Sequence, residues 1–341
     1  MFSCPISHDD DSRIRLAHGG GGEMTARLIH DIFLPAFGSE GAPLHDSTVI
    51  PSPGARLAVT TDGFVVHPSE FPGGDIGSLA VHGTINDLAM SGARPLHLTA
   101  AFILEEGLDN ALLRRVAHSM GSAAQRAGIT LVAGDTKVVE RGKGDGIYIA
   151  TTGIGVVEHG QDIGPSSIRV GDSVLVSGDL GRHGATIMNA RAGIGIESEL
   201  RSDSANVWPA VSRLLEAEVA IHCLRDITRG GLAMTLNELA EDSGTGIVVR
   251  EKDIPVSAPV RASCDLLGLD PLQAACEGRF IAIVPEQDAA RTLDLLREDH
   301  PEASLIGTVG ERRTAPLMID GLLGVRRLLA KPLGEQLPRI C

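Results

Sequence analysis

The feature of this sequence that most constrains its fold is the order in which strand and helix patterns follow one another. Runs rich in β-branched residues predict four strands in the first half of the chain, over residues 47–50, 56–66, 129–139 and 147–157. Between the second and third of them, apolar residues at helical spacing predict two helices, over residues 76–92 and 109–128, each ending at a glycine. A glycine run and an amphipathic helix over residues 24–37 precede the first strand.

A second series of elements begins near residue 165. It opens with a strand, a Gly-rich turn and a helix within residues 166–188, and continues with a loop and a helix over residues 224–244. A strand, a helix and a strand follow over residues 280–311. This order is that of an α+β sandwich, and 341 residues exceed what one hydrophobic core usually holds. We therefore expect a flexible N-terminal segment, two domains and a mobile or docked tail, with boundaries at 1–40, 41–160, 161–322 and 323–341.

Charge and composition argue against two classes of partner. The net charge is −14, from 30 Lys and Arg against 44 Asp and Glu, and no basic block occurs, so nucleic acid and membrane surfaces are not expected partners. No apolar run reaches the roughly 18 residues of a membrane span, and the first residues do not read as a secretory signal. The five cysteines are widely spaced and form no C-x-x-C pair, which favours a reducing cytoplasm.

The acidic residues of the chain suggest a site for Mg²⁺ and phosphates. No P-loop, no dinucleotide-binding glycine motif, no H-E-x-x-H and no G-x-S-x-G occurs. Polar residues instead lie at predicted strand ends, helices and loops: Asp46, Asp62, Asn86, Asp87, Asp135 and Asp226. Carboxylates on the loops of a rigid sheet suit Mg²⁺, which prefers oxygen ligands and substrate phosphates. Each aspartate alone is also an ordinary turn or N-cap residue, and spacing does not bring them into one pocket.

Two glycine-containing segments are candidate anion sites. Gly20, Gly21 and Gly22 offer backbone N–H groups that would wrap phosphates, although the same run fits a flexible linker. Thr228 and Arg229 directly precede a predicted helix, whose N-terminus together with the guanidinium would bind an anion. An ordinary helix start explains this second segment equally well.

Three further side chains are candidates for chemistry. Lys137 interrupts an apolar strand, where an inward side chain would stabilise developing negative charge and an outward one would only be solvated. Glu277 lies between a helix and a strand, where burial would raise its pKa toward that of a general base, unless it is a surface loop residue. Cys341 ends the chain, either as a frayed terminus or as the tip of an arm that carries a group.

Taken together, these segments resemble the HypE family of hydrogenase maturation factors, the carbamoyl dehydratases. The resemblance covers nearly the whole chain and is carried by HGGGGE, FPGGDIG, GDTKVV, SGDLGRHGATIM, RDITRGGLA and the terminal PRIC. It extends more distantly to the aminoimidazole ribonucleotide synthetase superfamily, with selenophosphate synthetase and thiamine monophosphate kinase. It implies an α+β fold of two α/β sandwich domains with an ATP cleft between them, a flexible C-terminal tail, and a homodimer formed through the N-terminal sheets.

The resemblance also implies a role for each candidate residue. The Mg²⁺–phosphate cluster would be held by Asp46, Asp62, Asp87 and Asp226. The nucleotide would be held by Asn86, Asp135, Thr228 and Arg229, under the loop of Gly20, Gly21 and Gly22. Cys341 would carry the substrate, Lys137 would stabilise charge, and Glu277 would take protons from nitrogen, with His97 as a weaker candidate.

The reaction implied by the resemblance begins with a partner, HypF, which transfers a carbamoyl group to Cys341. ATP then drives dehydration of this S-carboxamide to an S-cyanate. A HypC–HypD complex would accept the cyanide for the iron of a [NiFe]-hydrogenase. Two other functions stay open: an ATP-dependent kinase or synthetase that acts on a free small molecule, and a non-catalytic carrier that only presents the thiol.

Overall fold

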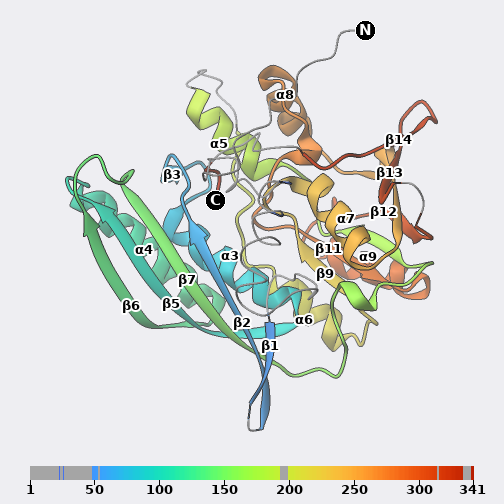
Figure 1. Cartoon of the computed structure of the whole chain (residues 1–341), viewed down its shortest axis with the longest axis horizontal. Coiled ribbons are helices and arrows are strands. Elements are labelled where there is room, and N and C mark those ends of the chain that lie inside the picture. Colours follow the sequence, from blue (N-terminus) through green and yellow to red (C-terminus); the bar gives the residue numbers. More distant parts are fainter. Residues whose placement is uncertain are drawn as a thin grey trace.

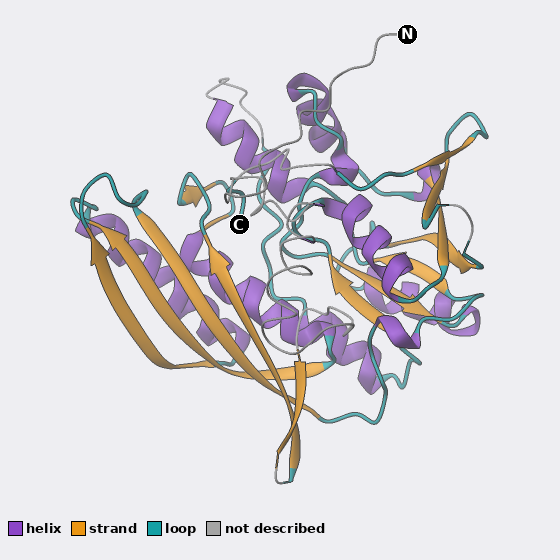
Figure 2. Cartoon of the chain, viewed as in Figure 1, coloured by secondary structure: helices purple, strands orange, loops and turns teal. Residues whose placement is uncertain are grey.

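Two large β-sheets and the helices packed on them make up the fold (Figures 1 and 2). The structure is a computed structural model that describes residues 54–192, 199–312, 315–332 and 339–341, the backbone of 48–52, and Glu23 and Ala26. Residues 48–157 supply every strand of the first sheet, and residues 173–328 supply every strand of the second among those described. The expected α+β class is therefore confirmed.

The first sheet has five described strands, all long except the first. In spatial order they are β1 (Thr48–Ser52), β2 (Ala55–Phe64), β7 (Ile147–Val157), β5 (Ala93–Glu105) and β6 (Thr130–Val139). Neighbours run antiparallel except β5 and β6, which are parallel and joined through helix α4 (Asn110–Ala127). Helix α3 (Ile76–Met90) packs on β2, β7 and β5, and α4 packs on α3. A two-stranded hairpin of β3 (Glu70–Phe71) and β4 (Gly74–Asp75) precedes α3.

Helix α3 lies at the centre of the molecule. Its start is fixed by Asp75, whose carboxylate accepts hydrogen bonds from the N–H groups of Gly77 and Ser78 in a capping box. Almost all its side chains are buried, because its first turns face the first sheet while Ala89 and Met90 join the apolar core of the second. An apolar helix without a solvated face therefore connects the two sheets.

The second sheet is covered on both faces. Its strand order is β14 (Arg326–Leu328), β13 (Leu317–Asp320), β10 (Gly246–Arg250), β12 (Ser304–Gly310), β8 (Ser173–Val176), β11 (Phe280–Val284) and β9 (Cys223–Asp226). Alternate residues of β8 and β11 enter two different cores, one with helix α7 (Gly231–Asp242) and one with α6 (Trp208–Glu216) and α9 (Glu286–Arg297). Every residue of β8 and β11 is buried as a result, which explains their continuous apolar runs.

The remaining described helices lie between or beside these layers. They are α5 (Arg182–Ala192), α8 (Ala258–Leu267) and the short 3₁₀ turns η3 (Pro165–Ser167), η4 (Glu251–Asp253) and η5 (Pro271–Gln273). Helix α5 approaches the β3–β4 hairpin and the C-terminus in Figure 1. None of the helices within the described residues combines the length and the apolar character that a membrane crossing needs.

Most predicted elements are present, and the departures have local causes. Strand β5 was not predicted; it begins with a proline-containing stretch and has an irregular register between Pro95 and His97. Strand β9 was predicted as a loop, because it is only four residues long and its last two residues, Arg225 and Asp226, are charged. In the segment expected as a tail, β14 pairs with β13, and residues 339–341 dock against the first domain.

Candidate active site

The end of β9 and the loop 276–279 are held together by main-chain hydrogen bonds. The N–H of Ile227 donates to the carbonyl of Arg279 (3.1 Å), and the N–H of Cys276 donates to the carbonyl of Ile227 (2.8 Å). Gly231 lies so close to η5 that a Cβ atom there would be 2.7 Å from the Leu272 carbonyl oxygen, at a φ of +60°. Only glycine fits this position, so the segment with Asp226, Thr228 and Arg229 is fixed beside Glu277.

The last three residues of the chain dock on the segment that follows β2. The N–H of Val65 donates to the carbonyl oxygen of Cys341 (3.0 Å), and the N–H of His67 donates to that of Arg339 (3.1 Å). Ile340 is buried in the core of the first domain, and Cys341 packs against the same core. The chain terminus therefore pairs with residues 65–67 in the manner of a short added strand.

Two arginines strengthen this docking. Arg191 of α5 donates to the carbonyls of His67 and Arg339. The guanidinium of Arg339 forms an ion pair with Asp145 and donates to the Val65 carbonyl. Side chains from both halves of the chain thus hold the terminus in place.

Five side chains share one electrostatic environment around the docked thiol. Burial, followed by the charge of Glu277, raises the pKa of the Cys341 thiol. Burial, followed by the charges of Asp226 and Asp62, raises the pKa of Glu277 well above its usual value. The pKa of Arg229 is raised by Cys341 and, against the effect of burial, by Asp62. The structure thus places Asp62, Asp226, Arg229 and Glu277 within electrostatic range of Cys341, which the spacing of these residues in the sequence could not show.

Glu277 is fixed through hydrogen bonds of its main chain. The residue is 3% exposed, and its Oε1 atom has no hydrogen-bond partner among the described residues. Its N–H donates to the carboxylate of Asp203 (3.3 Å), and its carbonyl accepts from the amide of Asn86 (3.2 Å). A buried carboxylate with a raised pKa and an uncommitted oxygen has the properties of a general base.

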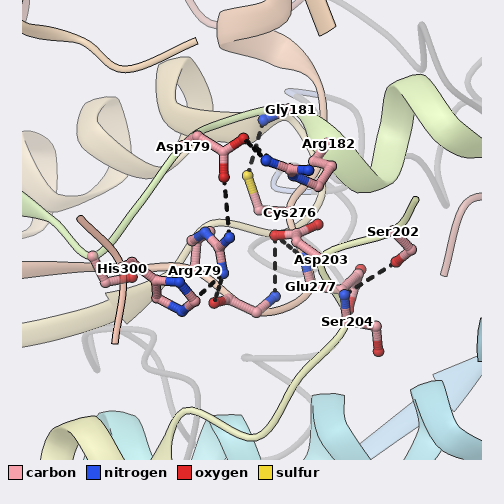
Figure 3. Close-up of polar contacts among 12 residues, drawn as sticks. Asp179, Gly181, Arg182, Ser202, Asp203, Ser204, Cys276, Glu277, Arg279 and His300 are labelled. Atoms are coloured by element: carbon pink, nitrogen blue, oxygen red, sulfur yellow. Dashed lines mark hydrogen bonds and ion pairs between the residues drawn. The ribbon is translucent and has the colours of Figure 1, made fainter. Parts of the chain in front are cut away.

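The other end of the Glu277 loop is anchored by a buried ion pair (Figure 3). Arg279 donates to Asp179 (3.0 Å), with side-chain exposures of 7% and 2%. Asp179 also pairs with Arg182 at the start of α5, and Arg279 contacts His300. Breaking one partner of such a pair leaves a buried charge, so this anchor resists movement of the loop.

Asn86 lies at the junction of the domains. Its amide nitrogen donates to the carbonyls of Ala205 (2.9 Å) and Glu277, and its Oδ1 accepts from the N–H of Val207 (2.9 Å). Both amide hydrogens are therefore donated to main-chain carbonyls. The structure assigns Asn86 to holding the segment 205–207 against Glu277, and a role as nucleotide ligand would have to use the remaining capacity of its oxygen.

The predicted metal-binding carboxylates have the appropriate chemistry for Mg²⁺. Asp62 faces α3 near Gly83, and the carboxylate of Asp87 accepts the hydroxyl of Thr60 (2.8 Å), two residues before Asp62 on the same strand face. Within the described parts of the chain, no three His, Cys, Asp or Glu side chains are grouped closely enough to bind a metal ion alone. Mg²⁺ usually takes only one or two carboxylates, with phosphates and waters completing its shell, so these carboxylates fit it.

Asp135 and Lys137 lie apart from this cluster. Their ion pair (2.8 Å) is on β6, with side-chain exposures of 62% and 71%. Three strand spacings separate β6 from β2, which is about 14 Å. Of the two orientations left open for Lys137, the structure shows the exposed one within a single chain. His97 is likewise exposed on β5.

Several predictions fall on residues outside those described, and several site residues were not predicted. Asp46 and the loop glycines Gly20, Gly21 and Gly22 lie outside the described ranges. Sequence reasoning missed Asp203 and Ser202, which belong to a segment without regular structure. No spacing or motif signals them, because their importance comes from contacts with residues far away in the chain.

Comparisons with known proteins give consistent relatives. Residues 44–157 match the family model of the AIR synthase related protein N-terminal domain, and residues 169–319 match that of the C-terminal domain. The carbamoyl dehydratase HypE of Azotobacter vinelandii is 48% identical over 332 residues, covering 96% of this chain and 97% of that protein. The carbamoyl dehydratase HypE of Escherichia coli strain K12 is 43% identical over 339 residues, covering 97% of this chain and all of that protein (100%).

Solved structures agree with these relatives. The hydrogenase maturation protein HypE in complex with ATP superimposes with a TM-score of 0.82 at 45% identity, covering 96% of this chain and 100% of that one. A chain from the crystal structure of a HypE–HypF complex superimposes with a TM-score of 0.84 at 39% identity, covering 89% of this chain and 99% of that one. Thiamine monophosphate kinase of Aquifex aeolicus shares the fold, with a TM-score of 0.65 at 20% identity, covering 85% of this chain and 95% of that one.

Proposed function

This chain belongs to the HypE family of carbamoyl dehydratases, with the two-domain AIR synthase fold, and on this premise we propose the chemistry of its own residues. It uses ATP to dehydrate an S-carboxamide on Cys341 to an S-cyanate, which supplies cyanide during maturation of [NiFe]-hydrogenase. The observation that carries the proposal is the docked terminus, which puts Cys341 in the same electrostatic environment as the buried Glu277.

The reaction needs one activation and two deprotonations. The oxygen of the thiocarbamate attacks the γ-phosphate of ATP, ADP leaves, and one proton leaves the nitrogen. The C–O bond of this phosphorylated intermediate then breaks, phosphate leaves with the bonding electrons, and the second proton leaves the nitrogen. The product is a thiocyanate on Cys341, and a site that excludes water protects the activated intermediate from hydrolysis.

Glu277 is the base in this scheme. Its uncommitted Oε1 can receive a proton from nitrogen, and its raised pKa makes the carboxylate a stronger base than an exposed glutamate. Arg229, which lies in the same cluster, supplies positive charge to offset the charge that develops on the phosphate.

The nucleotide and its metal ion bind at the neighbouring carboxylates. Mg²⁺ neutralises phosphate charge when bound, and its ligands are drawn from Asp46, Asp62, Asp87 and Asp226. Thr228 and Arg229 bind phosphate at the start of α7, and the loop of Gly20, Gly21 and Gly22 covers it. Asn86 acts by holding the domain junction. An Asp87→Asn variant is expected to lose most ATP turnover.

The working form is a homodimer that pairs through β6. The residues of this edge strand are almost all exposed, and the exposed apolar side chains include Leu131 (37%), Val132 (51%) and Val138 (67%). An edge strand with this much apolar surface needs cover to avoid non-specific association. Because Asp135 and Lys137 lie on the same strand, they act on nucleotide and substrate across the dimer, in the site of the second copy.

The protein exchanges its cargo with other maturation proteins in the cytoplasm. A relative forms a HypE–HypF complex, and HypF is the proposed carbamoyl donor for Cys341. A HypC–HypD complex is the proposed acceptor of the cyanide. Because the docked thiol has a raised pKa and is a poor nucleophile, loading takes place with the terminus released.

Intact mass spectrometry after incubation with HypF and a carbamoyl donor tests the function. The wild-type chain should gain one carbamoyl group and, once ATP is added, lose one water. A Cys341→Ala variant should gain nothing; full loading of that variant would refute the carrier role. A kinase acting on a free small molecule would keep its ATP-dependent activity without residues 337–341, and a pure carrier would be loaded but would not hydrolyse ATP.

A further inference from the structure

A chain of hydrogen bonds connects the docked terminus with the segment that fixes Glu277. His183 of α5 is fully buried, with its ring edge-on to Phe71 (centroids 5.4 Å apart). Its Nε2 atom lies 2.5 Å from the carbonyl oxygen of Ile340, and its Nδ1 atom lies 2.7 Å from the hydroxyl of Ser202. The imidazole thus joins residue 340 to residue 202, which are far apart in the sequence.

The direction of each hydrogen bond follows from its partners. The Ile340 carbonyl only accepts, so Nε2 of His183 donates. Burial lowers the pKa of His183, so the ring is neutral and its Nδ1 accepts from the Ser202 hydroxyl. The oxygen of Ser202 in turn accepts from the N–H of Ser204 (3.1 Å). A continuous series of hydrogen bonds therefore runs from the N–H of Ser204 through Ser202 and His183 to the Ile340 carbonyl. We call this series the relay.

Ser202 and Ser204 of the relay lie on either side of Asp203, whose carboxylate holds the main chain of Glu277. One oxygen of the Asp203 carboxylate accepts from the N–H groups of Glu277 (3.3 Å) and Gly278 (3.4 Å), as Figure 3 shows. Gly278 packs so tightly that a Cβ atom there would lie 2.0 Å from the Asp203 carbonyl oxygen. A shift of residues 202–204 would therefore be passed directly to the Glu277 loop.

The opposite side of the segment rests on the first domain. The N–H of Ser202 donates to the carbonyl of Pro72 (2.8 Å), and the hydroxyl of Ser204 contacts His82 of α3 (3.0 Å). These contacts do not involve the terminus. The Ser202 hydroxyl links the segment to His183, and His183 in turn bonds the Ile340 carbonyl.

We propose that Ser202 is a positioning residue through which docking of residues 340–341 fixes the Asp203 segment and thereby Glu277. This inference rests on the proposed function. Glu277 is held in its working position when the loaded thiol is docked, and it is held less firmly when the terminus is away. The relay couples the arrival of the substrate to completion of the site, without any contact between Ser202 and the reacting atoms.

The test is the ATP-dependent loss of water from HypF-loaded protein, followed by intact mass over a range of ATP concentrations. Ser202→Ala should lower kcat by ~10-fold or more, because small misplacements of a catalytic group cost that much, and should leave KM for ATP within ~2-fold. Ser202→Thr keeps the hydroxyl and should restore most of the rate. Ser212→Ala is the control, since it removes a serine hydroxyl that donates to the Pro209 carbonyl within helix α6 and takes no part in holding residues 202–204, and it should behave as wild type.

A double variant separates the relay from a general loss of structure. If Ser202 acts through Asp203, the Ser202→Ala change should slow an Asp203→Asn protein no further. Independent, multiplicative losses would overturn the proposal, as would a wild-type kcat for Ser202→Ala or a loss confined to KM. Failure of the proposed function would look different, because the wild-type protein itself would then not lose water when ATP is added.

Discussion

Two regions of the molecule carry a predicted catalytic side chain, and they differ in almost every physical respect. Glu277 is 3% exposed, in a loop fixed by Asp203, Asn86 and the buried Arg279–Asp179 pair. Lys137 has a side chain that is 71% exposed, on an edge strand, with Asp135 as its ion-pair partner. From sequence the two residues looked alike, as polar positions beside apolar runs.

Burial and exposure let these two side chains contribute to catalysis in different ways. A carboxylate buried among other acids has its pKa shifted by its own chain, and its geometry is set before any ligand arrives. An exposed pair on an edge strand is mostly solvated, so it gains catalytic strength only when another surface excludes water from it. We therefore expect the buried loop to act within one chain and the β6 edge to act through a second copy.

The largest effect is expected from the buried side of this comparison. Replacing Glu277 with Gln keeps the shape and removes the base, so dehydration should slow by ~10²–10⁴-fold, the usual contribution of a general base. Loading of Cys341 by HypF and binding of ATP should be unaffected, because neither uses the Glu277 carboxylate. Single-turnover intact mass gives the dehydration rate, and calorimetric titration of ATP is the control. Dehydration at the normal rate would remove Glu277 from this role.

The next largest effect is expected at the β6 edge. Val132→Asp places a charge in the proposed dimer interface, and an unpaired buried carboxylate costs about 3 kcal/mol, or roughly 10²-fold in dimer affinity. Light scattering should show a monomer with strongly reduced dehydration. Val170→Asp is the control, since Val170 is similarly exposed (58% against 51%) and lies outside the sheet. A monomeric Val132→Asp protein with full activity would show that Lys137 is not needed across the dimer.

The fold was largely predictable because its signals are local. Gly128 ends α4 in the left-handed conformation, as the glycine stop predicted. The long strands β2 and β7 carry their β-branched patterns within single segments. Strand β9 escaped prediction because its identity as a strand depends on β11, more than fifty residues later in the chain.

The site was predictable only in part, for a related reason. The candidates included Asp62, Asp226, Arg229 and Glu277, and the structure places all four within electrostatic range of Cys341. The hydrogen bonds of Asp203 to the Glu277 loop and the relay through Ser202 belong to residues 202–207, a segment without sequence periodicity. Contacts with α3, α5 and the terminus decide the position of this segment. The orientation of Lys137 stayed open in the sequence, because a strand pattern does not reveal which strand lies at the edge of its sheet.

The pH dependence of the Glu277 loop should be measurable both in the rate and in stability. Dehydration should fall about tenfold per pH unit below the raised pKa of Glu277, because only the deprotonated base acts. The folded state holds this proton more tightly than the unfolded chain, whose Glu pKa is about 4.3. The contribution of Glu277 to stability is therefore fully present below that value and is lost as the pH rises through the folded pKa. In the absence of ATP, Glu277→Gln should unfold at a higher temperature than wild type near neutral pH, whereas a lower Tm would contradict the buried, repelled carboxylate.

The smallest effect is expected at the outer contact of the docked terminus. The ion pair of Arg339 with Asp145 is partly exposed, with side-chain exposures of 31% and 45%, and such pairs contribute about 0.2–1 kcal/mol. Asp145→Asn should therefore release the terminus at most ~5-fold more often. Because the docked thiol of Cys341 has a raised pKa, release should increase its alkylation rate by the same factor, as followed by mass spectrometry of the C-terminal peptide. Asp294→Asn, an exposed change on α9, is the control. An unchanged alkylation rate would mean that Ile340, His183 and Arg191 hold the terminus without help from Asp145. Buried contacts would then determine the docking of the terminus, as they determine the position of Glu277.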